Sequence, residues 1–320
     1  MGQQAISRSN FKFPGQTGVY HGKVRDVYTI NNKYLVAVAS DRISAFDVIL
    51  PKQIPYKGQV LNQLTDYFLE NTAGIAPNWL INTPDPNATI GYKCQPFKIE
   101  MVIRGCLVGH AWREYKAGKR EISGAKMPDG LKEYDDFPEP LLTPATKAEE
   151  GHDEDISPAE IVKSSLATKD EFDKLADITR KLFAKGQKMA RDRGLFLADT
   201  KYEIGLLNGE FYIIDEVHTP DSSRYFYADS YDAYVSGKSK DQPKHLSKEF
   251  VREWLMEKGF SGQAGQKLPA MGNDFVNMVS DRYIELYEEM TGQKFVKPDT
   301  NQDPLTRIEK NVNKALEELR

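Results

Sequence analysis

Cysteine is scarce in this 320-residue sequence, which has only Cys94 and Cys106. Neither stands in a Cys-x-x-Cys pair or beside a histidine at ligand spacing, so the sequence predicts neither a disulfide framework nor a zinc site. Long apolar runs are also missing. No stretch approaches the ~20 residues that a membrane helix needs, and the first residues lack the apolar core of a signal peptide. We therefore expect a cytoplasmic protein without a membrane partner.

An excess of positive charge is likewise absent. The 43 Lys and Arg residues stand against 47 Asp and Glu, for a net charge of −4, and no run is rich in Lys or Arg. A nucleic-acid partner therefore has little support, because phosphate backbones are bound by clustered cations. No Ser-His-Asp or Cys-His set for nucleophilic catalysis stands out either. An enzyme that acts on small, charged substrates remains open.

The composition, 40% hydrophobic and 28% charged, is that of a globular chain long enough for two lobes. Val27–Ile30 and Tyr34–Ala39, separated by Asn31-Asn32, predict a hairpin in a β-rich first part. From Glu121 to Asp155, many Pro, Gly and acidic residues predict long irregular segments. We expect an α/β (α+β) protein with a β-rich lobe at 1–105, an α/β lobe at 106–246 and a helical extension at 247–320.

Helical periodicity is strongest in the second half of the chain. A long helix is predicted from Thr168, which has capping-box spacing to Glu171, as far as Gly194. Further helices are predicted in three places: after Ser247, from about Asp274 to Met290, and from Asp303-Pro304 onward.

A second hairpin is predicted at Asn208-Gly209, the strongest short-range turn signal in the sequence. A two-residue turn there would pair Glu203 with Ile214. Side chains alternate along a strand, so this register predicts that Glu203 and Asp215 point to opposite faces and cannot share an ion.

A three-residue turn, with Gly209 left-handed, would slip the register by one residue. Lys201, Glu203 and Asp215 would then share one face. Two such carboxylates could hold a magnesium ion that also binds phosphate oxygens, with the lysine as a further counter-charge. A solvated hairpin face with ordinary salt bridges explains the same residues at least as well.

A turn rich in glycine and cations, Gly22-Lys23-Val24-Arg25, precedes the first predicted hairpin. It could lie over phosphates, with Lys23 and Arg25 as counter-charges. It lacks the Gly-Lys-Ser/Thr ending of a P-loop, and a plain turn before an edge strand is the more common explanation.

Polar groups also follow two apolar strands. Asp41 and Ser44 belong to the run Ser40–Asp47, where they either contact a ligand or form caps and turns. Arg104 ends another apolar strand, and its cation needs a partner, which is either a substrate phosphate or a structural carboxylate.

Taken in order along the chain, these segments resemble one known family, SAICAR synthetase (phosphoribosylaminoimidazole-succinocarboxamide synthase). The matching segments are GKVRDVY at Gly22–Tyr28, SDRISAFDV at Ser40–Val48, VIRG at Val102–Gly105, TPATKAE at Thr143–Glu149, KYEIG at Lys201–Gly205 and DEVHTPDSSR at Asp215–Arg224. Their combination is far more specific than any one of them. The chain after Ser247 resembles the C-terminally extended branch of that family.

The resemblance implies a two-lobed fold with antiparallel sheets and an ATP cleft between the lobes, similar to protein kinases and ATP-grasp enzymes. It also implies an ATP- and Mg²⁺-dependent ligase of purine biosynthesis. Such an enzyme joins L-aspartate to the carboxylate of 5-amino-1-(5-phosphoribosyl)imidazole-4-carboxylate (CAIR) through an acyl phosphate. Its products are the succinocarboxamide SAICAR, ADP and phosphate.

The family's residue roles carry over to matching positions. Those implied for ATP and metal are Gly22, Lys23, Val24 and Arg25 on the ATP phosphates, Glu203 and Asp215 on Mg²⁺, and Lys201 near the transferring phosphate. Those implied around the imidazole nucleotide and aspartate are Asp41, Ser44, Arg104, Lys147, Asp221 and Arg224, with the two arginines on the nucleotide's phosphate.

One position departs from the family's pattern. Many relatives read Gly-Ser-Ala-Trp after VIRG, whereas this chain reads Gly109-His110-Ala111-Trp112. His110 therefore stands where the family has a serine that contacts the substrate phosphate, and it either takes over that role or leaves it unfilled.

Two other classes of protein would share these residues. A phosphotransferase that stops after phosphorylating its substrate needs the same Lys, Glu and Asp, and it would release ADP without aspartate. A non-catalytic nucleotide-binding protein would bind ATP without turnover.

Overall fold

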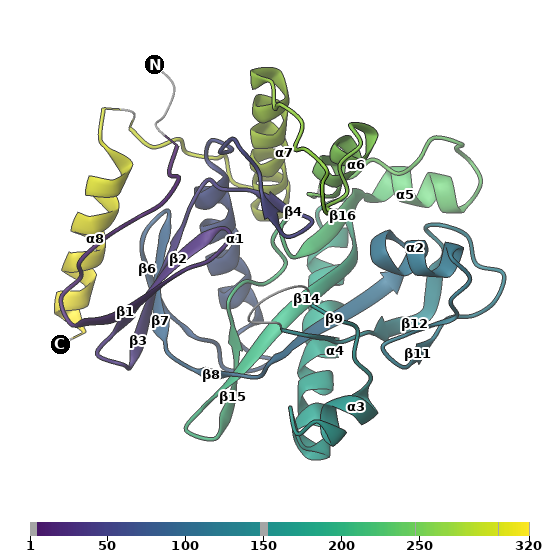
Figure 1. Ribbon diagram of the computed structural model, residues 1–320, viewed down its shortest axis with the longest axis horizontal. Coiled ribbons are helices and arrows are strands. Elements are labelled where there is room, and N and C mark those ends of the chain that lie inside the picture. Colours follow the sequence, from purple (N-terminus) through teal and green to yellow (C-terminus); the bar gives the residue numbers. More distant parts are fainter. Residues whose placement is uncertain (1–4, 148–152, 247, 300, 320) are drawn as a thin grey trace. The chain divides into compact units, whose positions relative to one another are not determined.

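The computed structural model describes residues 5–147, 153–246, 248–299 and 301–319 (Figure 1). These residues form a mixed α/β fold whose sheets are antiparallel, which confirms the predicted fold class. They divide into two compact units, one within Met1–Glu70, Trp79–Lys93 and Phe250–Arg320 and the other within Asn71–Asn78 and Cys94–Glu249. The predicted ATP cleft and the predicted division at residues 105 and 246 remain predictions.

The first unit is built on a five-stranded sheet in the order β1-β2-β3-β7-β6. Its strands are β1 (Gln16–His21), β2 (Arg25–Ile30), β3 (Tyr34–Ala39), β6 (Leu80–Asp85) and β7 (Ala88–Tyr92). The predicted first hairpin is confirmed as β2 and β3, and both Asn31 and Asn32 in its turn have positive φ. Asparagine tolerates that conformation better than most side chains, so this pair turns the chain at low cost.

Helix α8 (Pro304–Glu318) packs its apolar stripe on this sheet. The shared cluster includes Ile308, Val312, Ala315 and Leu316 of the helix and Tyr28, Ile30, Val36, Val38 and Ile90 of the strands. Asp303 caps the helix, since its carboxylate accepts the Thr306 N–H at 2.8 Å, and Pro304 follows at the first position. The predicted last helix is confirmed.

The remaining named elements that belong wholly or mainly to this unit are α1 (Lys57–Thr72), α6 (Glu249–Glu257), α7 (Asn273–Thr291) and the short hairpin of β4 (Ser44–Ala45) and β5 (Val48–Ile49). Helix α7 confirms the prediction for this stretch. The predicted cap of α6, Ser247, lies outside the described residues. Helices α7 and α8 thus belong to the same compact unit as the N-terminal sheet.

The second unit is built on a seven-stranded sheet whose longest member is β14 (Leu195–Leu207). One edge of β14 pairs with β8 (Gln95–Pro96) and β9 (Ile99–Cys106), and the other with β15 (Glu210–Ile214) and β16 (Ser223–Tyr227). In turn, β9 pairs with β12 (Asp136–Leu142) and β13 (Ala145–Thr146). Neighbours on both edges fix the direction of every side chain of β14 over most of its length.

Helix α4 (Lys169–Arg191) packs against β14 and β9. The predicted capping box is confirmed: Thr168 Oγ1 accepts the Glu171 N–H at 3.2 Å, and Glu171 Oε2 accepts the Thr168 N–H at 2.7 Å. Gly194, at φ +71°, follows the helix end as predicted. Shorter helices of this unit are α2 (Gly109–Lys116), α3 (Pro158–Lys163) and α5 (Ala228–Val235).

The prediction of long irregular segments between Glu121 and Asp155 holds only in part. It contains β10 (Glu121–Ile122), which pairs with β11 (Ala125–Lys126), as well as β12 and β13. Strand β12 contains Pro138 and Pro140. Its register with β9 shifts between Asp136 and Leu141, the stretch that holds both prolines. Proline is tolerated there because β12 is an edge strand, where a missing N–H donor costs no ladder bond.

Both cysteines are buried free thiols. Burial raises the pKa of Cys94 to about 11 and raises that of Cys106 as well, so both stay protonated and unreactive. Within the described part of the chain, we find no helix whose length and apolar character would let it cross a bilayer.

Candidate active site

Strand β14 carries two of the residues around which the predicted chemistry is arranged, Lys201 and Glu203. Because side chains alternate along a strand, Lys201 and Glu203 project from one face and the intervening Tyr202 from the other. Lys201 Nζ forms an ion pair with Glu100 of β9, and Lys147, which follows β13, forms one with Glu203. The sheet thus brings two lysines and two carboxylates from distant parts of the sequence to one place.

The hairpin at Asn208-Gly209 has the two-residue turn. Leu207 pairs with Glu210, and Glu203 pairs with Ile214. Asn208 and Gly209 both have positive φ, 52° and 82°, as a type I′ turn requires. The alternative three-residue turn with a shifted register is therefore wrong.

Asp215 nevertheless acts on the same lysines as Glu203. Strand β15 ends at Ile214, and Asp215 has φ +57°, so strand alternation no longer governs its side chain. Its negative charge, like that of Glu203, bears on both Lys147 and Lys201. The prediction that this register separates the two acids extended strand geometry one residue past the strand's end, so the register alone does not decide where the Asp215 carboxylate lies.

Burial and charge have opposite effects on the two lysines. Burial lowers the pKa of Lys147 and of Lys201, but the neighbouring carboxylates outweigh it and raise both pKa values above the ordinary lysine range. Both side chains therefore stay protonated at neutral pH. The carboxylates of Glu100, Glu203 and Asp215 all act on these two ammonium groups.

Glu203 and Asp215 offer the hard oxygen donors that Mg²⁺ prefers. Mg²⁺ commonly takes one or two carboxylates and completes its shell with waters and substrate phosphates. Among the residues that the structure describes, no group of three or more His, Cys, Asp or Glu side chains could hold a metal ion. The pair therefore fits an ion shared with ATP better than one caged by protein alone. Binding of Mg²⁺ stays a prediction.

Two buried arginines share one carboxylate nearby in the sheet. Arg104 donates from Nη1 to Asp199 Oδ2 at 3.0 Å and from Nε to Thr143 Oγ1 at 2.9 Å. Arg224 pairs with the same Asp199 oxygen and, at 3.1 Å, with Glu249 Oε2. The register explains the arrangement, because Asp199 of β14 is paired with Arg104 on β9 and with Arg224 on β16. The partner that Arg104 was predicted to need is here a structural carboxylate.

The start of α2 packs against Arg224. Gly109 has φ +56°, and a Cβ atom there would lie 2.1 Å from Arg224 Nη2. The next residue, His110, is hydrogen-bonded through Nε2 to Asp155 Oδ2 at 3.0 Å, which lowers the pKa of that carboxyl group. Arg104 also lies in the field of Asp155. Arg104, Arg224 and His110, all predicted near the substrate phosphate, thus belong to one region.

Asp221 lies on the segment that leads from β15 into β16, and its side chain is almost fully buried. Lys248 Nζ lies 3.6 Å from its Oδ2. The sequence reading missed Lys248, as it missed Asp199 and Glu249. These three residues lie outside the segments singled out as candidates. Only the fold shows that they pair with the predicted residues Arg104, Arg224 and Asp221.

In the first unit, the turn Gly22-Lys23-Val24-Arg25 joins β1 to β2. The Gly22 N–H donates to the Arg25 carbonyl at 2.8 Å. Arg42 braces the turn from inside, because its guanidinium donates to the carbonyls of Gly22 at 3.0 Å and Lys23 at 3.1 Å and to buried Asp26 at 2.9 Å. Arg42 lies within a motif that the sequence had singled out, but this role could not be read from it.

The other predicted residues of this unit have different surroundings. The Lys23 side chain forms an exposed ion pair with Asp47, and Ser44 is half-buried on β4. The Asp41 carboxylate is buried and accepts the N–H groups of Ile6 at 2.8 Å and Gly58 at 2.9 Å. Burial raises its pKa to about 6, against the opposing effect of these bonds. These contacts are structural, and substrate binding by Asp41 or Ser44 stays a prediction.

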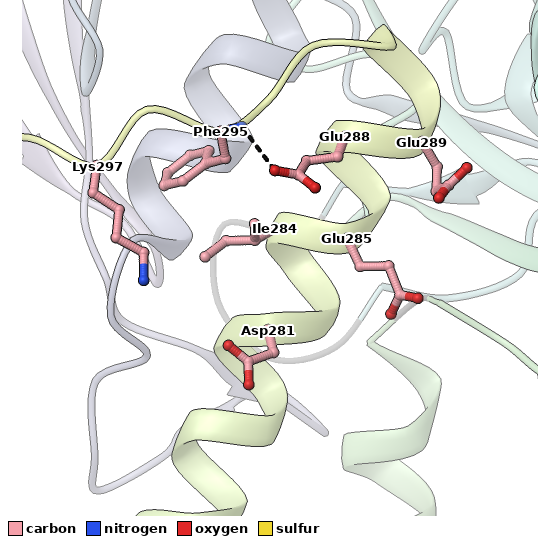
Figure 2. Close-up of a pocket in the computed structure, with 7 residues that line it drawn as sticks. All are labelled: Asp281, Ile284, Glu285, Glu288, Glu289, Phe295 and Lys297. Atoms are coloured by element: carbon pink, nitrogen blue, oxygen red, sulfur yellow. Dashed lines mark hydrogen bonds between the residues drawn. The ribbon is translucent and has the colours of Figure 1, made fainter.

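A groove of about 460 Å³ lies along α7 in the first unit (Figure 2). Its lining residues are Asp281, Ile284, Glu285, Glu288, Glu289, Phe295 and Lys297. The Glu288 carboxylate accepts the Phe295 N–H at 2.9 Å. Such an acidic lining would repel a phosphorylated substrate, and none of the predicted site residues belongs to it.

The chain is similar to proteins of one family over most of its length. The profile of the family described as SAICAR synthetase matches residues 18–267. Two relatives named phosphoribosylaminoimidazole-succinocarboxamide synthase, from Bacteroides thetaiotaomicron and Cytophaga hutchinsonii, are 58% and 54% identical, over 97% and 98% of this chain and 98% and 99% of theirs. A solved structure described as SAICAR-synthase from Saccharomyces cerevisiae complexed with SAICAR has a TM-score of 0.77 at 33% identity and covers 92% of this chain and 100% of that one.

Proposed function

The chain belongs to the SAICAR synthetase family, and from that premise we propose which of its residues carry out the ATP-dependent joining of L-aspartate to the carboxylate of CAIR. The activity is that of a carbon-nitrogen ligase in purine biosynthesis, a phosphoribosylaminoimidazole-succinocarboxamide synthase. The observation that carries the proposed residue roles is that Glu203 and Asp215 act on the same two lysines, Lys147 and Lys201.

The chemistry explains why such a cluster is needed. A carboxylate oxygen is a poor leaving group, so an amine does not displace it directly. Transfer of the γ-phosphoryl group of ATP forms a bond between that oxygen and phosphorus, and ADP leaves. The aspartate amine then forms the new C–N bond as the C–O bond to phosphate breaks, and the amine loses a proton to a base that is not identified. Phosphoryl transfer of this kind depends on positioned cations rather than on a protein nucleophile.

Around the transferring phosphate, Glu203 and Asp215 bind Mg²⁺, and Lys201 donates to phosphate oxygens. When bound, Mg²⁺ supplies positive charge to the phosphates of ATP. Lys201 is held charged and oriented by Glu100, and Lys147 by Glu203. Lys147 therefore lies beside the metal-binding acids, where a substrate carboxylate would meet it.

The phosphate of the ribonucleotide binds at Arg104 and Arg224, with His110 at the edge of that site. In support, the two arginines lie together on adjoining strands and are already oriented by Asp199. Asp221, Asp41 and Ser44 complete the contacts to the imidazole nucleotide and aspartate.

The turn Gly22-Lys23-Val24-Arg25 binds the ATP phosphates, with Lys23 and Arg25 as counter-charges. Its braced backbone supports this role, because a fixed turn need not be ordered when ATP arrives. We propose that the reaction runs in the cytoplasm on small molecules alone, which the two free, buried cysteines and the balanced charge support.

Substitutions of the two acids test the proposal. Asp215→Asn and Glu203→Gln each remove one oxygen ligand with little change in shape, so turnover should fall by a factor of about 100 or more while the protein stays folded. Glu210→Gln, an exposed change in the same hairpin, is the matched control and should retain wild-type rates. Near-normal turnover in Asp215→Asn would refute the metal assignment.

The assay itself separates the ligase from a phosphotransferase. With ATP, Mg²⁺ and CAIR present, ADP release should depend on aspartate and should match amide formation mole for mole. Sustained ADP release without aspartate and without amide would instead indicate a phosphotransferase.

A further inference from the structure

The segment from Asp215 to Ser222 leaves the sheet between two strands, β15 and β16, that pair with the same edge of β14. Two of its residues, Asp215 and His218, have positive φ, 57° and 55°. Such backbone conformations persist in residues other than glycine only where the surroundings hold them. The contacts that hold this segment therefore decide where the Asp215 carboxylate lies.

His218 anchors the segment. It is fully buried, and its Nε2 is hydrogen-bonded to Tyr202 Oη at 2.5 Å. The two rings meet edge-on, with centroids 5.3 Å apart, and the His218 carbonyl accepts the hydroxyl of Tyr225 at 2.8 Å. A Cβ atom on Gly186 of α4 would lie 2.4 Å from His218 Cε1, so α4 has room for this ring only because it has glycine there.

The charge state of the Tyr202–His218 pair follows from burial. Burial lowers the pKa of His218 to about 3 and raises that of Tyr202 well above its ordinary value. At neutral pH the imidazole is uncharged and the phenol keeps its proton. The hydrogen bond therefore joins two uncharged groups, and the tautomer of His218 decides which of them donates.

Tyr202 stands between Lys201 and Glu203 in β14, and its side chain points to the opposite face. The same three residues thus present the lysine and acid of the proposed site on one face and hold His218 on the other. We infer that Tyr202 and His218 are positioning residues for the reaction, because their hydrogen bond fixes the segment that carries Asp215. The inference rests on the proposed function, in which Asp215 binds Mg²⁺.

The test measures metal binding directly as well as turnover. Mn²⁺ binding in the presence of ATP, followed by electron paramagnetic resonance, reports the state of the two acids. Tyr202→Phe removes the hydroxyl that is hydrogen-bonded to His218 and leaves the backbone unchanged. We expect the Kd for Mn²⁺ to rise about tenfold and kcat to fall about tenfold, with the KM for CAIR within about twofold of wild type.

A pair of substitutions at His218 provides a second probe that does not depend on the stability of Tyr202→Phe. Glutamine can place an acceptor oxygen where Nε2 lies, so His218→Gln should keep Mn²⁺ affinity within about threefold of wild type. Asparagine tolerates positive φ but is too short to reach Tyr202. The affinity of His218→Asn for Mn²⁺ should therefore be about tenfold lower than that of the wild type.

Tyr231→Phe is the control for a merely structural role. Tyr231 is also fully buried in this unit, and its hydroxyl bonds to the Tyr134 carbonyl and Asp136, both at 2.7 Å. The Tyr231→Phe variant should be less stable than the wild type but should bind Mn²⁺ with the same affinity. Wild-type Mn²⁺ affinity in Tyr202→Phe or in His218→Asn would overturn the inference, and it would leave the proposed function standing provided that Asp215→Asn is inactive. Wild-type Mn²⁺ affinity in Asp215→Asn would overturn the proposed function itself.

Discussion

Arg104 and Arg224 bind the same oxygen of one buried carboxylate, Asp199 Oδ2. Burial lowers the pKa of Arg104, and repulsion by the charge of Arg224 lowers it further. Asp199 offsets that repulsion and sets the orientation of both guanidinium groups. A phosphate that binds here meets donors that are already in place, so little entropy is lost in ordering them.

Asp199→Asn should therefore destabilise the protein and weaken nucleotide binding together. Removing the charge leaves two buried cations without their shared counter-ion, and we expect the free energy of unfolding to fall by about 3–5 kcal/mol. The KM for CAIR should rise because the arginines lose their orientation. Urea unfolding and steady-state kinetics measure the two effects. Asp232→Asn, which breaks an exposed pair with Arg191, is the control and should cost less than about 1 kcal/mol.

Gly109→Ala should displace Arg224. The added methyl group would lie 2.1 Å from Nη2, and the positive φ adds backbone strain. We expect the KM for CAIR to rise at least about fivefold, with a loss of about 1–2 kcal/mol in stability. Gly194→Ala separates the two effects, because Gly194 also has positive φ, +71°, but has no atom within 4 Å of the added carbon. Equal KM values in the two variants would contradict the proposed position of the phosphate.

Arg42→Lys should weaken ATP binding through the turn that Arg42 braces. A lysine ammonium cannot reproduce the planar set of donors that reaches the Gly22 and Lys23 carbonyls and Asp26. We expect a rise of about fivefold or more in the KM for ATP and a loss of about 1–3 kcal/mol in stability.

The control for that prediction is Arg307→Lys. Arg307 is buried in the same unit, where it donates to Asp85 at 2.9 Å and to Asn87 at 2.8 Å. Arg307→Lys should lower the free energy of unfolding by an amount similar to that for Arg42→Lys and should leave the KM for ATP unchanged. A normal KM for ATP in a folded Arg42→Lys enzyme would argue that the turn does not contact ATP.

Local chemistry made part of this structure predictable. The Thr168 capping box, the Asn208-Gly209 turn and the start of α8 at Asp303-Pro304 depend on residues a few positions apart, and each is found where the sequence places it. Strand β12 was missed because its prolines argue against a strand unless its place at a sheet edge is known.

The site was predictable only in its motif residues. Asp199 acquires its role because β14 lies between β9 and β16, and strand order is not written in local patterns. The relation of Glu203 to Asp215 could not be predicted for a different reason. Hairpin register can be deduced from the turn, but Asp215 lies one residue past the strand and has positive φ, which the local pattern does not indicate.

The stability of the protein should depend on pH through His218. Its folded-state pKa is about 3, against an ordinary value of 6.5, so below pH 6.5 the unfolded state takes up a proton that the folded state does not. Stability is therefore unaffected by this residue above pH 6.5 and falls as the pH drops toward 3. At two pH units below 6.5, this proton uptake should lower the free energy of unfolding by about 3 kcal/mol.

Comparison with His218→Gln isolates this contribution, because glutamine does not titrate. Asp41 works in the opposite direction, since its raised pKa of about 6 makes the folded state bind a proton first as the pH falls, but it is present in both proteins and cancels. The difference in free energy of unfolding between the two proteins should shift by about 3 kcal/mol in favour of His218→Gln between pH 7 and pH 4.5. Urea unfolding at several pH values provides the measurement. Parallel curves for the two proteins would mean that the histidine takes up its proton in the folded state as readily as in the unfolded one, and that it is not held neutral beside Tyr202.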